Sequence, residues 1–388
     1  LFILLIVSLA QSLQAHDGMI NVRDYGAFGN GTDQTAEIQA AINAAAAQTL
    51  ANNPSGHGGG TWLASCPTVF IPSGRYKIDG SINMASSYIH IRGDNAIFEP
   101  VDNPSDPNAP AITCSSPYRV KLSGMIFLDF VNAIKWGTST YDVDQGLTEI
   151  SNCQFVGISG TAIQYGSQSS ILSVIDCRFD YPEKALHIWR CDKVVFERCW
   201  LSKTPLTEAE DHIILLEGGS IQINNSFFIT AGSNTGAETA WIKATTGAGT
   251  RVNEVCITNC RFSDEANGTT LINWYVPADV TFPSDPVGII IRDTHAEGGP
   301  SHVSGQDQSL VRLFKCPNFL HIKNNRGILN CVPMAWASGV NPTTEVFTDG
   351  ANSPLNVEIS GNAGNGTPAS GFQVNGLPAE FVGKANLR

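Results

Sequence analysis

A degenerate repeat runs through most of the chain and constrains its fold more than any other feature. Each unit has an apolar residue, two variable residues, a small or polar residue, and usually an aromatic residue two places further on. The clearest units are ISNCQF from Ile150, VIDCRF from Val174, FERCWL from Phe196, INNSFF from Ile223 and ITNCRF from Ile257. Weaker units begin at Ile91, Leu122, Ile291, Ile322 and Ile359. The spacing between units, about 22 to 37 residues, is typical of a solenoid.

A second short apolar segment follows most units at a similar distance, as in NAIKWG, TAIQYG, KALHIW, HIILLE, TAWIKA, TLINWY and SLVRLF. Short strands separated by turn residues, without an amphipathic helical period, favour stacked sheets over an α/β fold. One coil of a parallel β-helix needs about three short strands and three turns, and longer units would extrude loops. We therefore predict an all-β fold, a right-handed parallel β-helix of about ten coils. Its open ends need caps.

Four of the ten cysteines share the fourth position of the repeat: Cys153, Cys177, Cys199 and Cys260, with Ser226 where another would fall. Equivalent positions on successive coils stack, so we expect an interior column of small side chains. Buried packing thiols fit this column better than disulfides do. The chain has no Cys-x-x-Cys pair, which disfavours a zinc site. The six remaining cysteines could form disulfides.

The charge and hydropathy of the chain limit which classes of partner it can bind and where in or outside the cell it is expected. The formal net charge of -12 argues against a nucleic-acid partner, and an anionic glycan would need a local basic patch. Residues 1–15, LFILLIVSLAQSLQA, read as a secretory signal truncated at its start and ending at Ala15, so we expect a secreted or periplasmic protein. No later segment could span a membrane. Residues 16–388 contain no linker and are predicted to form a single domain. The oligomeric state stays open.

The segment NVRDYGAFGNGTDQTAEIQAAINAA (Asn21–Ala45), followed by VFIPSGRYKI (Val69–Ile78), resembles the start of the pectate-lyase superfamily. More narrowly, it resembles rhamnogalacturonases, epimerase-like proteins and phage tailspikes. The pattern predicts a strand, a glycine turn, an N-cap at Asp33, an Ala-rich helix and a second strand. This N-terminal region, residues 20–80, would cap the first coil. The resemblance implies a parallel β-helix that handles polysaccharides, and the superfamily uses that scaffold for several chemistries.

In the similar polygalacturonases, acidic residues lie just before the strand that lines the groove. The same position here holds Glu183 with Lys184, then Asp211 with His212, then Glu238. Neighbouring coils lie about 4.8 Å apart, so these carboxylates would fall about 5 or 10 Å apart. Such spacings bracket those of retaining and inverting glycoside hydrolases. We therefore expect a glycoside hydrolase with Glu183, Asp211 and Glu238 as catalytic residues.

A polysaccharide lyase is a close alternative, because it needs a base beside a uronate carboxylate and a cation for the developing charge. One outward column could supply them: Lys135, Gln164, His187 and Arg312. Trp189 could stack on a sugar ring, with Arg190 next to it. No metal site or cofactor is predicted, although a lyase could bind calcium with the acidic residues. A third alternative is a non-catalytic glycan-binding or adhesive β-helix.

Overall fold

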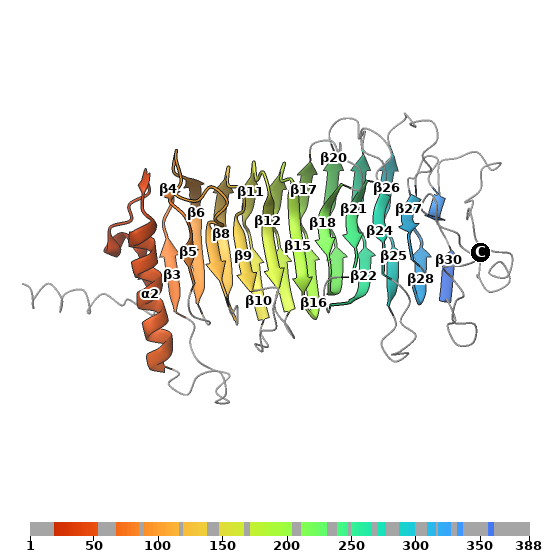
Figure 1. Cartoon of the computed structure of the whole chain (residues 1–388), viewed down its shortest axis with the longest axis horizontal. Coiled ribbons are helices and arrows are strands. Elements are labelled where there is room, and N and C mark those ends of the chain that lie inside the picture. Colours follow the sequence, from red (N-terminus) through yellow and green to blue (C-terminus); the bar gives the residue numbers. More distant parts are fainter. Residues whose placement is uncertain are drawn as a thin grey trace, which may run out of the picture.

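The computed structural model describes residues 19–52, 67–84, 89–115, 119–137, 147–166, 171–203, 211–230, 239–246, 250–264, 270–276, 287–298, 309–315, 317–326, 332–336 and 356–360. Its strands form two long sheets, and every pairing between named strands is parallel, as Figure 1 shows for the stack as a whole. The smaller sheet contains β5 (Ile82–Asn83), β7 (Ile112–Cys114), β9 (Ile134–Gly137), β12 (Thr161–Gly166), β15 (Lys184–Arg190), β18 (His212–Leu216), β21 (Ala240–Ala244), β24 (Thr270–Trp274), β27 (Ser309–Leu313) and β29 (Val332–Trp336).

The larger sheet contains the remaining strands, which occupy two sides of the stack. Its N-terminal strands are β1 (Met19–Asn21), β2 (Asn30–Asp33), β3 (Thr68–Ile71), β4 (Gly74–Ile78), β6 (His90–Pro100) and β8 (Lys121–Leu128). The next are β10 (Leu147–Ser151), β11 (Gln154–Val156), β13 (Ile171–Ile175), β14 (Arg178–Asp180), β16 (Lys193–Glu197), β17 (Trp200–Lys203), β19 (Gly219–Asn224) and β20 (Phe227–Thr230). The last are β22 (Val252–Thr258), β23 (Arg261–Asp264), β25 (Gly288–Arg292), β26 (His295–Gly298), β28 (Phe319–Lys323) and β30 (Asn356–Ser360).

One coil consists of three consecutive strands, for example β13, β14 and β15, each paired with its equivalent on the next coil. The 10 strands of the smaller sheet correspond to the predicted number of coils. A crossover connection between two parallel strands of the same sheet is almost always right-handed. The predicted right-handed parallel β-helix is therefore confirmed.

From β10 to β26, a sharp bend joins the two larger-sheet strands of a coil, and it explains the repeat. The residue before the fourth repeat position adopts the left-handed conformation, with φ between 51° and 55°, at Asn152, Asp176, Arg198, Asn225, Asn259, Asp293 and Asn324. Asn and Asp tolerate this conformation better than most residues. The aromatic residue two places after the fourth position points inward and stacks on its equivalent. The Phe155 and Phe179 rings, for example, lie 4.8 Å apart.

The predicted column of small side chains follows each bend and is confirmed. Cys153, Cys177, Cys199 and Cys260 are each at most 3% exposed, and all are thiols. Each thiol donates to the carbonyl two residues earlier, and Ser226 does the same with its hydroxyl. Burial raises the pKa of Cys260 to about 12.

Of the other cysteines, Cys114, Cys191 and Cys256 are buried thiols. Cys66, Cys316 and Cys331 lie outside the described residues.

Helix α2 (Thr35–Asn52) covers the N-terminal end of the stack beside β3, as predicted for the cap (Figure 1). It follows the short 3-10 helix η1 (Val22–Tyr25) and buries Ile38, Ala41, Ile42 and Ala45. Asp33 accepts a hydrogen bond from the Thr35 backbone N–H at 3.1 Å, so it caps the helix from just outside it. Among the described helices, none has the length and apolar character needed to cross a membrane.

Candidate functional site on the smaller sheet

The strands of the smaller sheet differ in charge from the rest of this acidic chain. They contain no Asp or Glu, and their basic residues are Lys135, Lys184, Arg190, Lys243 and Arg312, with histidines at 187 and 212. The strands of the larger sheet, in contrast, carry as many acidic as basic residues. All of these basic residues except the buried Arg312 reach the surface, where they can attract an anionic ligand despite the negative net charge.

The predicted column on this sheet is present in the strand register, and it is outward at Lys135, Gln164 and His187. Lys135 pairs with Gln164, and Gln164 pairs with His187 on the next strand. Leu186 and Ile188, on either side of His187, point inward and are fully buried, as expected. The column continues through later coils to Asn273 and Arg312.

His187 makes the most specific contacts in the column. Its Nε2 lies 3.0 Å from Oε2 of Glu217, and the two side chains are 20% and 27% exposed. The imidazole lies 4.9 Å from the Trp189 ring, and Nζ of Lys135 lies 5.7 Å from the centre of that indole. Sequence reasoning missed Glu217, which directly follows β18 in the segment HIILLE. These four side chains, Lys135, His187, Trp189 and Glu217, are called the His187 site below.

An irregularity in the strand pairing places the Trp189 ring. Tyr165 pairs with Ile188 and Gly166 pairs with Arg190, so Trp189 is an extra residue without a partner position in β12. Such β-bulges redirect side chains and are frequent next to active sites. Gly166 in turn pairs with Gly137, whose φ is 79°. A Cβ on Gly137 would lie 1.8 Å from the Gly166 carbonyl oxygen, so only glycine fits there.

Two of the three predicted catalytic carboxylates lie in equivalent turns. Glu183 directly precedes β15, and Asp211 directly precedes β18. The register between these two paired strands makes Glu183 and Asp211 equivalent positions. Lys203, a lysine that sequence reasoning missed, lies close enough to both carboxylates to interact with their charges. Nζ of Lys203, at the end of β17, lies 3.6 Å from Oδ2 of Asp211, and the lysine side chain is 4% exposed. Burial lowers the pKa of Lys203, opposed by the charges of Asp211 and Glu183.

The third predicted carboxylate does not continue this alignment. His212 pairs with Ala240, so the residue beside Asp211 on the next coil is Thr239, and Glu238 is one position earlier. In this register Thr239, and not Glu238, is the equivalent of Asp211. Glu238 itself lies outside the described residues.

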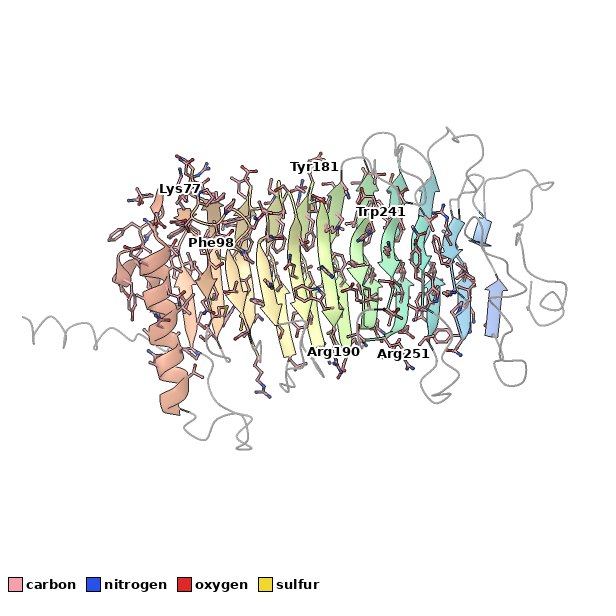
Figure 2. The ribbon with its side chains drawn as sticks, viewed as in Figure 1. Lys77, Phe98, Tyr181, Arg190, Trp241 and Arg251 are labelled. Carbon is pink, nitrogen blue, oxygen red and sulfur yellow. The ribbon has the colours of Figure 1, made fainter. Side chains whose placement is uncertain are left out.

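The remaining predicted site residues do not gather at one place. Lys184 and Arg190 are the two ends of β15, which has 7 residues and is therefore roughly 20 Å long. Figure 2 shows Arg190 at one edge of the stack and Tyr181, just before Glu183, at the opposite edge. Arg312 lies in the same register column as His187 but is only 7% exposed. Its Nη1 lies 3.4 Å from Oδ1 of the buried Asn273. It is therefore not at the surface.

Lys184 and Asp211 thus form one group with Glu183 around Lys203, and His212 directly follows Asp211. The His187 site is a second group further along the strands. Among the described residues, no group of three or more His, Cys, Asp or Glu side chains converges as a metal site would.

Comparisons with known proteins agree with this architecture. The fold defines a parallel β-helix protein, and the rhamnogalacturonase A/epimerase, pectate lyase-like family matches residues 19–290. The chain belongs to that family, which confirms the resemblance noted in its N-terminal segment. No curated protein matches the chain.

The solved structures that share the fold at low sequence identity include the following two. PfbA, a surface adhesin of Streptococcus pneumoniae, has 13% identity and a TM-score of 0.51, over 79% of this chain and 84% of the adhesin. The Agl-KA catalytic domain has 11% identity and a TM-score of 0.56, over 96% of this chain and 69% of that structure. One of these similar structures is an adhesin and the other a catalytic domain, so the similarity defines the fold and not the activity.

Proposed function

We propose that this protein is a secreted enzyme that modifies a uronate-containing polysaccharide by removing the proton next to the uronate carboxylate. The observation that carries the proposal is the His187–Glu217 pair, set beside an indole and a lysine on a sheet whose strands bear only basic charges. Membership of a family described by a rhamnogalacturonase and an epimerase supports a polysaccharide substrate.

The histidine is suited to act as the base. A carboxylate can only accept hydrogen bonds, so Glu217 selects the tautomer in which Nε2 of His187 donates to it. In that tautomer Nδ1 carries the lone pair that takes the substrate proton. The carboxylate also stabilises the imidazolium that results, as a buried acid does for a histidine in other enzymes.

The neighbouring side chains are suited to hold the substrate. Removal of the proton places negative charge on the uronate carboxylate, and the Lys135 ammonium would stabilise that charge. The Trp189 ring offers an apolar face on which a sugar ring can stack. The other basic side chains of the smaller sheet, apart from the buried Arg312, would bind further uronates along the stack.

Two reactions begin with this step. Loss of the neighbouring glycosidic oxygen gives an unsaturated product, and return of a proton from the opposite face gives an epimer. Hydrolysis is a second candidate, because Glu183 and Asp211 occupy equivalent positions on neighbouring coils. Against it, Asp211 lies beside Lys203 and its other oxygen accepts the His212 N–H at 2.8 Å.

The test is a panel of uronate polysaccharides, such as polygalacturonate, rhamnogalacturonan and alginate, assayed with calcium and with a chelator. We expect an unsaturated product or an epimer from at least one of them. His187→Ala should reduce formation of this product by at least about a hundredfold, and Glu217→Gln should also reduce it. The matched control is Glu254→Gln on the outer face of β22, which should keep full activity.

Other results would assign another function. New reducing ends without unsaturation, lost in Glu183→Gln and Asp211→Asn but kept in His187→Ala, would establish hydrolysis. Binding of a polysaccharide without any product would establish the non-catalytic alternative.

A further inference from the structure

We propose that the outer face of the larger sheet carries a second glycan-binding site, which takes a neutral pyranose ring instead of a uronate. Its side chains project from β14, β17 and β20, whereas the His187 site is on the smaller sheet. The inference goes beyond the proposed function, because a non-catalytic site on this face does not depend on the reaction at the other.

A row of aromatic and basic side chains crosses this face. Arg178, Trp200, Phe227 and Arg261 are paired in register on four neighbouring strands. The Trp200 and Phe227 rings lie 4.4 Å apart at 42°. The Arg178 guanidinium lies 5.9 Å from the Trp200 ring centre, and that of Arg261 lies 5.5 Å from the Phe227 ring centre. These contacts hold both rings in place before any ligand arrives.

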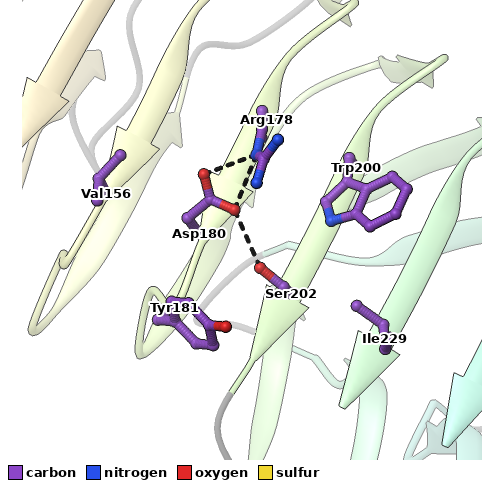
Figure 3. A pocket seen from close by; sticks show the side chains of 7 residues that line it. All are labelled: Val156, Arg178, Asp180, Tyr181, Trp200, Ser202 and Ile229. Atoms are coloured by element: carbon purple, nitrogen blue, oxygen red, sulfur yellow. Dashed lines mark hydrogen bonds and ion pairs between the residues drawn. The ribbon is translucent and has the colours of Figure 1, made fainter. Parts of the chain in front are cut away.

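Trp200 is 42% exposed although it is a large aromatic residue, so much of its surface is available to a ligand. Next to its ring lies a cavity of about 430 Å³, a volume within the range of small-molecule sites. Figure 3 shows the residues that line it: Val156, Arg178, Asp180, Tyr181, Trp200, Ser202 and Ile229.

A second aromatic side chain stands at the edge of this cavity. Tyr181 is 54% exposed and has a φ of 57°, a left-handed conformation that is unusual for a bulky residue. Its backbone N–H donates to the Ser202 carbonyl at 2.8 Å, which fixes the turn. The turn therefore holds an exposed phenol ring across the cavity from Trp200.

The polar side of the cavity is fixed and carries no net charge. The Asp180 carboxylate accepts hydrogen bonds from Arg178 Nε at 2.7 and 2.9 Å, from Gln154 Nε2 at 2.8 Å and from Ser202 Oγ at 3.1 Å. The Arg178 side chain is 60% exposed, so its guanidinium can also donate to ligand hydroxyls.

Because the Arg178 and Asp180 charges cancel, the cavity does not select an anion. Exposed rings beside fixed hydrogen-bonding groups match a neutral sugar, whose apolar face stacks while its hydroxyls form hydrogen bonds.

The experiment titrates the full-length protein calorimetrically with three neutral oligosaccharides: cellohexaose, mannohexaose and β-1,4-linked galactohexaose. We expect at least one to bind. Trp200→Ala should weaken that binding about tenfold, the size expected for one lost aromatic contact. Tyr181→Asn should also weaken it while keeping the fold, because Asn tolerates the left-handed conformation.

Two controls make the result specific. Trp189→Ala, on the smaller sheet, should bind the neutral sugar like the wild type, and Trp200→Ala should retain activity on a uronate polysaccharide. Failure of all three sugars to bind the wild type, or unchanged binding in both Trp200→Ala and Tyr181→Asn, would overturn the proposal. A concentration-dependent dimer that Trp200→Ala abolishes would assign the surface to self-association instead.

Discussion

Replacing Cys177 by aspartate tests the interior column of small side chains. The thiol is 2% exposed and lies 3.4 Å from the Ile175 carbonyl oxygen and 3.6 Å from the Ile150 carbonyl oxygen. A carboxylate has nearly the same reach but can only accept hydrogen bonds, so it would face two acceptors without water. Cys177→Ser is the matched control, because Ser226 occupies the same column and donates to the Asn224 carbonyl at 2.8 Å.

The expected cost follows from the proton that the buried carboxyl must bind. The ordinary pKa of Asp is about 3.9, and each pH unit corresponds to about 1.4 kcal/mol. Keeping the introduced carboxyl protonated at pH 7 therefore costs about 4 kcal/mol of unfolding free energy relative to Cys177→Ser. The folded variant binds more protons than the unfolded one above a pH of about 3.9, so its stability falls as the pH rises. Between pH 7 and pH 5 the difference should shrink by about 2.7 kcal/mol.

The assay is urea unfolding of both variants at several pH values, under reducing conditions. The slope with urea concentration should be the same for both, so that the midpoints report stability. A difference below about 1 kcal/mol that does not change with pH would refute the reasoning, since the carboxylate would then reach water.

Three further predictions concern other positions. Gly31 and Gly137 share a φ of 79°, but a Cβ on Gly31 would meet no atom within 4 Å, whereas one on Gly137 would meet the Gly166 carbonyl at 1.8 Å. In thermal unfolding, Gly31→Ala should lower the free energy of unfolding by about 1 kcal/mol, and Gly137→Ala should lower it clearly more. Equal losses of unfolding free energy would contradict the backbone contact at Gly137. Burial lowers the pKa of Lys203, so the folded state binds fewer protons than the unfolded state between that lowered pKa and 10.5. Wild-type stability should therefore rise with pH in that window relative to Lys203→Met, and parallel pH profiles of the two proteins would contradict the burial. The four column cysteines should resist alkylation in the folded protein, as mass spectrometry of native and unfolded samples can measure; fast native labelling would place them at the surface.

The repeat made the architecture predictable, because each coil encodes its own bend, inward aromatic residue and small column residue within a few consecutive positions. Cys177 and Phe179, for example, are placed by the bend at Asp176 next to them. Their stacking partners are simply the same positions on the neighbouring coils. Local sequence therefore determined most of the long-range contacts of the fold.

The candidate site was less predictable, because it depends on the register between coils that differ in their number of residues. One residue of difference places Thr239, and not Glu238, beside Asp211. The Trp189 bulge lies opposite the end of β12, at Tyr165 and Gly166, and Glu217 reaches His187 from the following coil. Lys203 ends a strand and lies beside Asp211, which is eight residues further along the chain. None of these features has a local sequence signal.

The central claim is that His187 removes a proton next to a uronate carboxylate. Its most direct test is the exchange of that hydrogen, followed by NMR or mass spectrometry of the substrate or product in D₂O. The account predicts that the wild type either incorporates deuterium at the carbon next to the carboxylate or loses the hydrogen there with formation of a double bond. His187→Ala should slow both by at least about a hundredfold. A product formed at the wild-type rate by His187→Ala, or a cleaved product that retains the original hydrogen, would contradict the account.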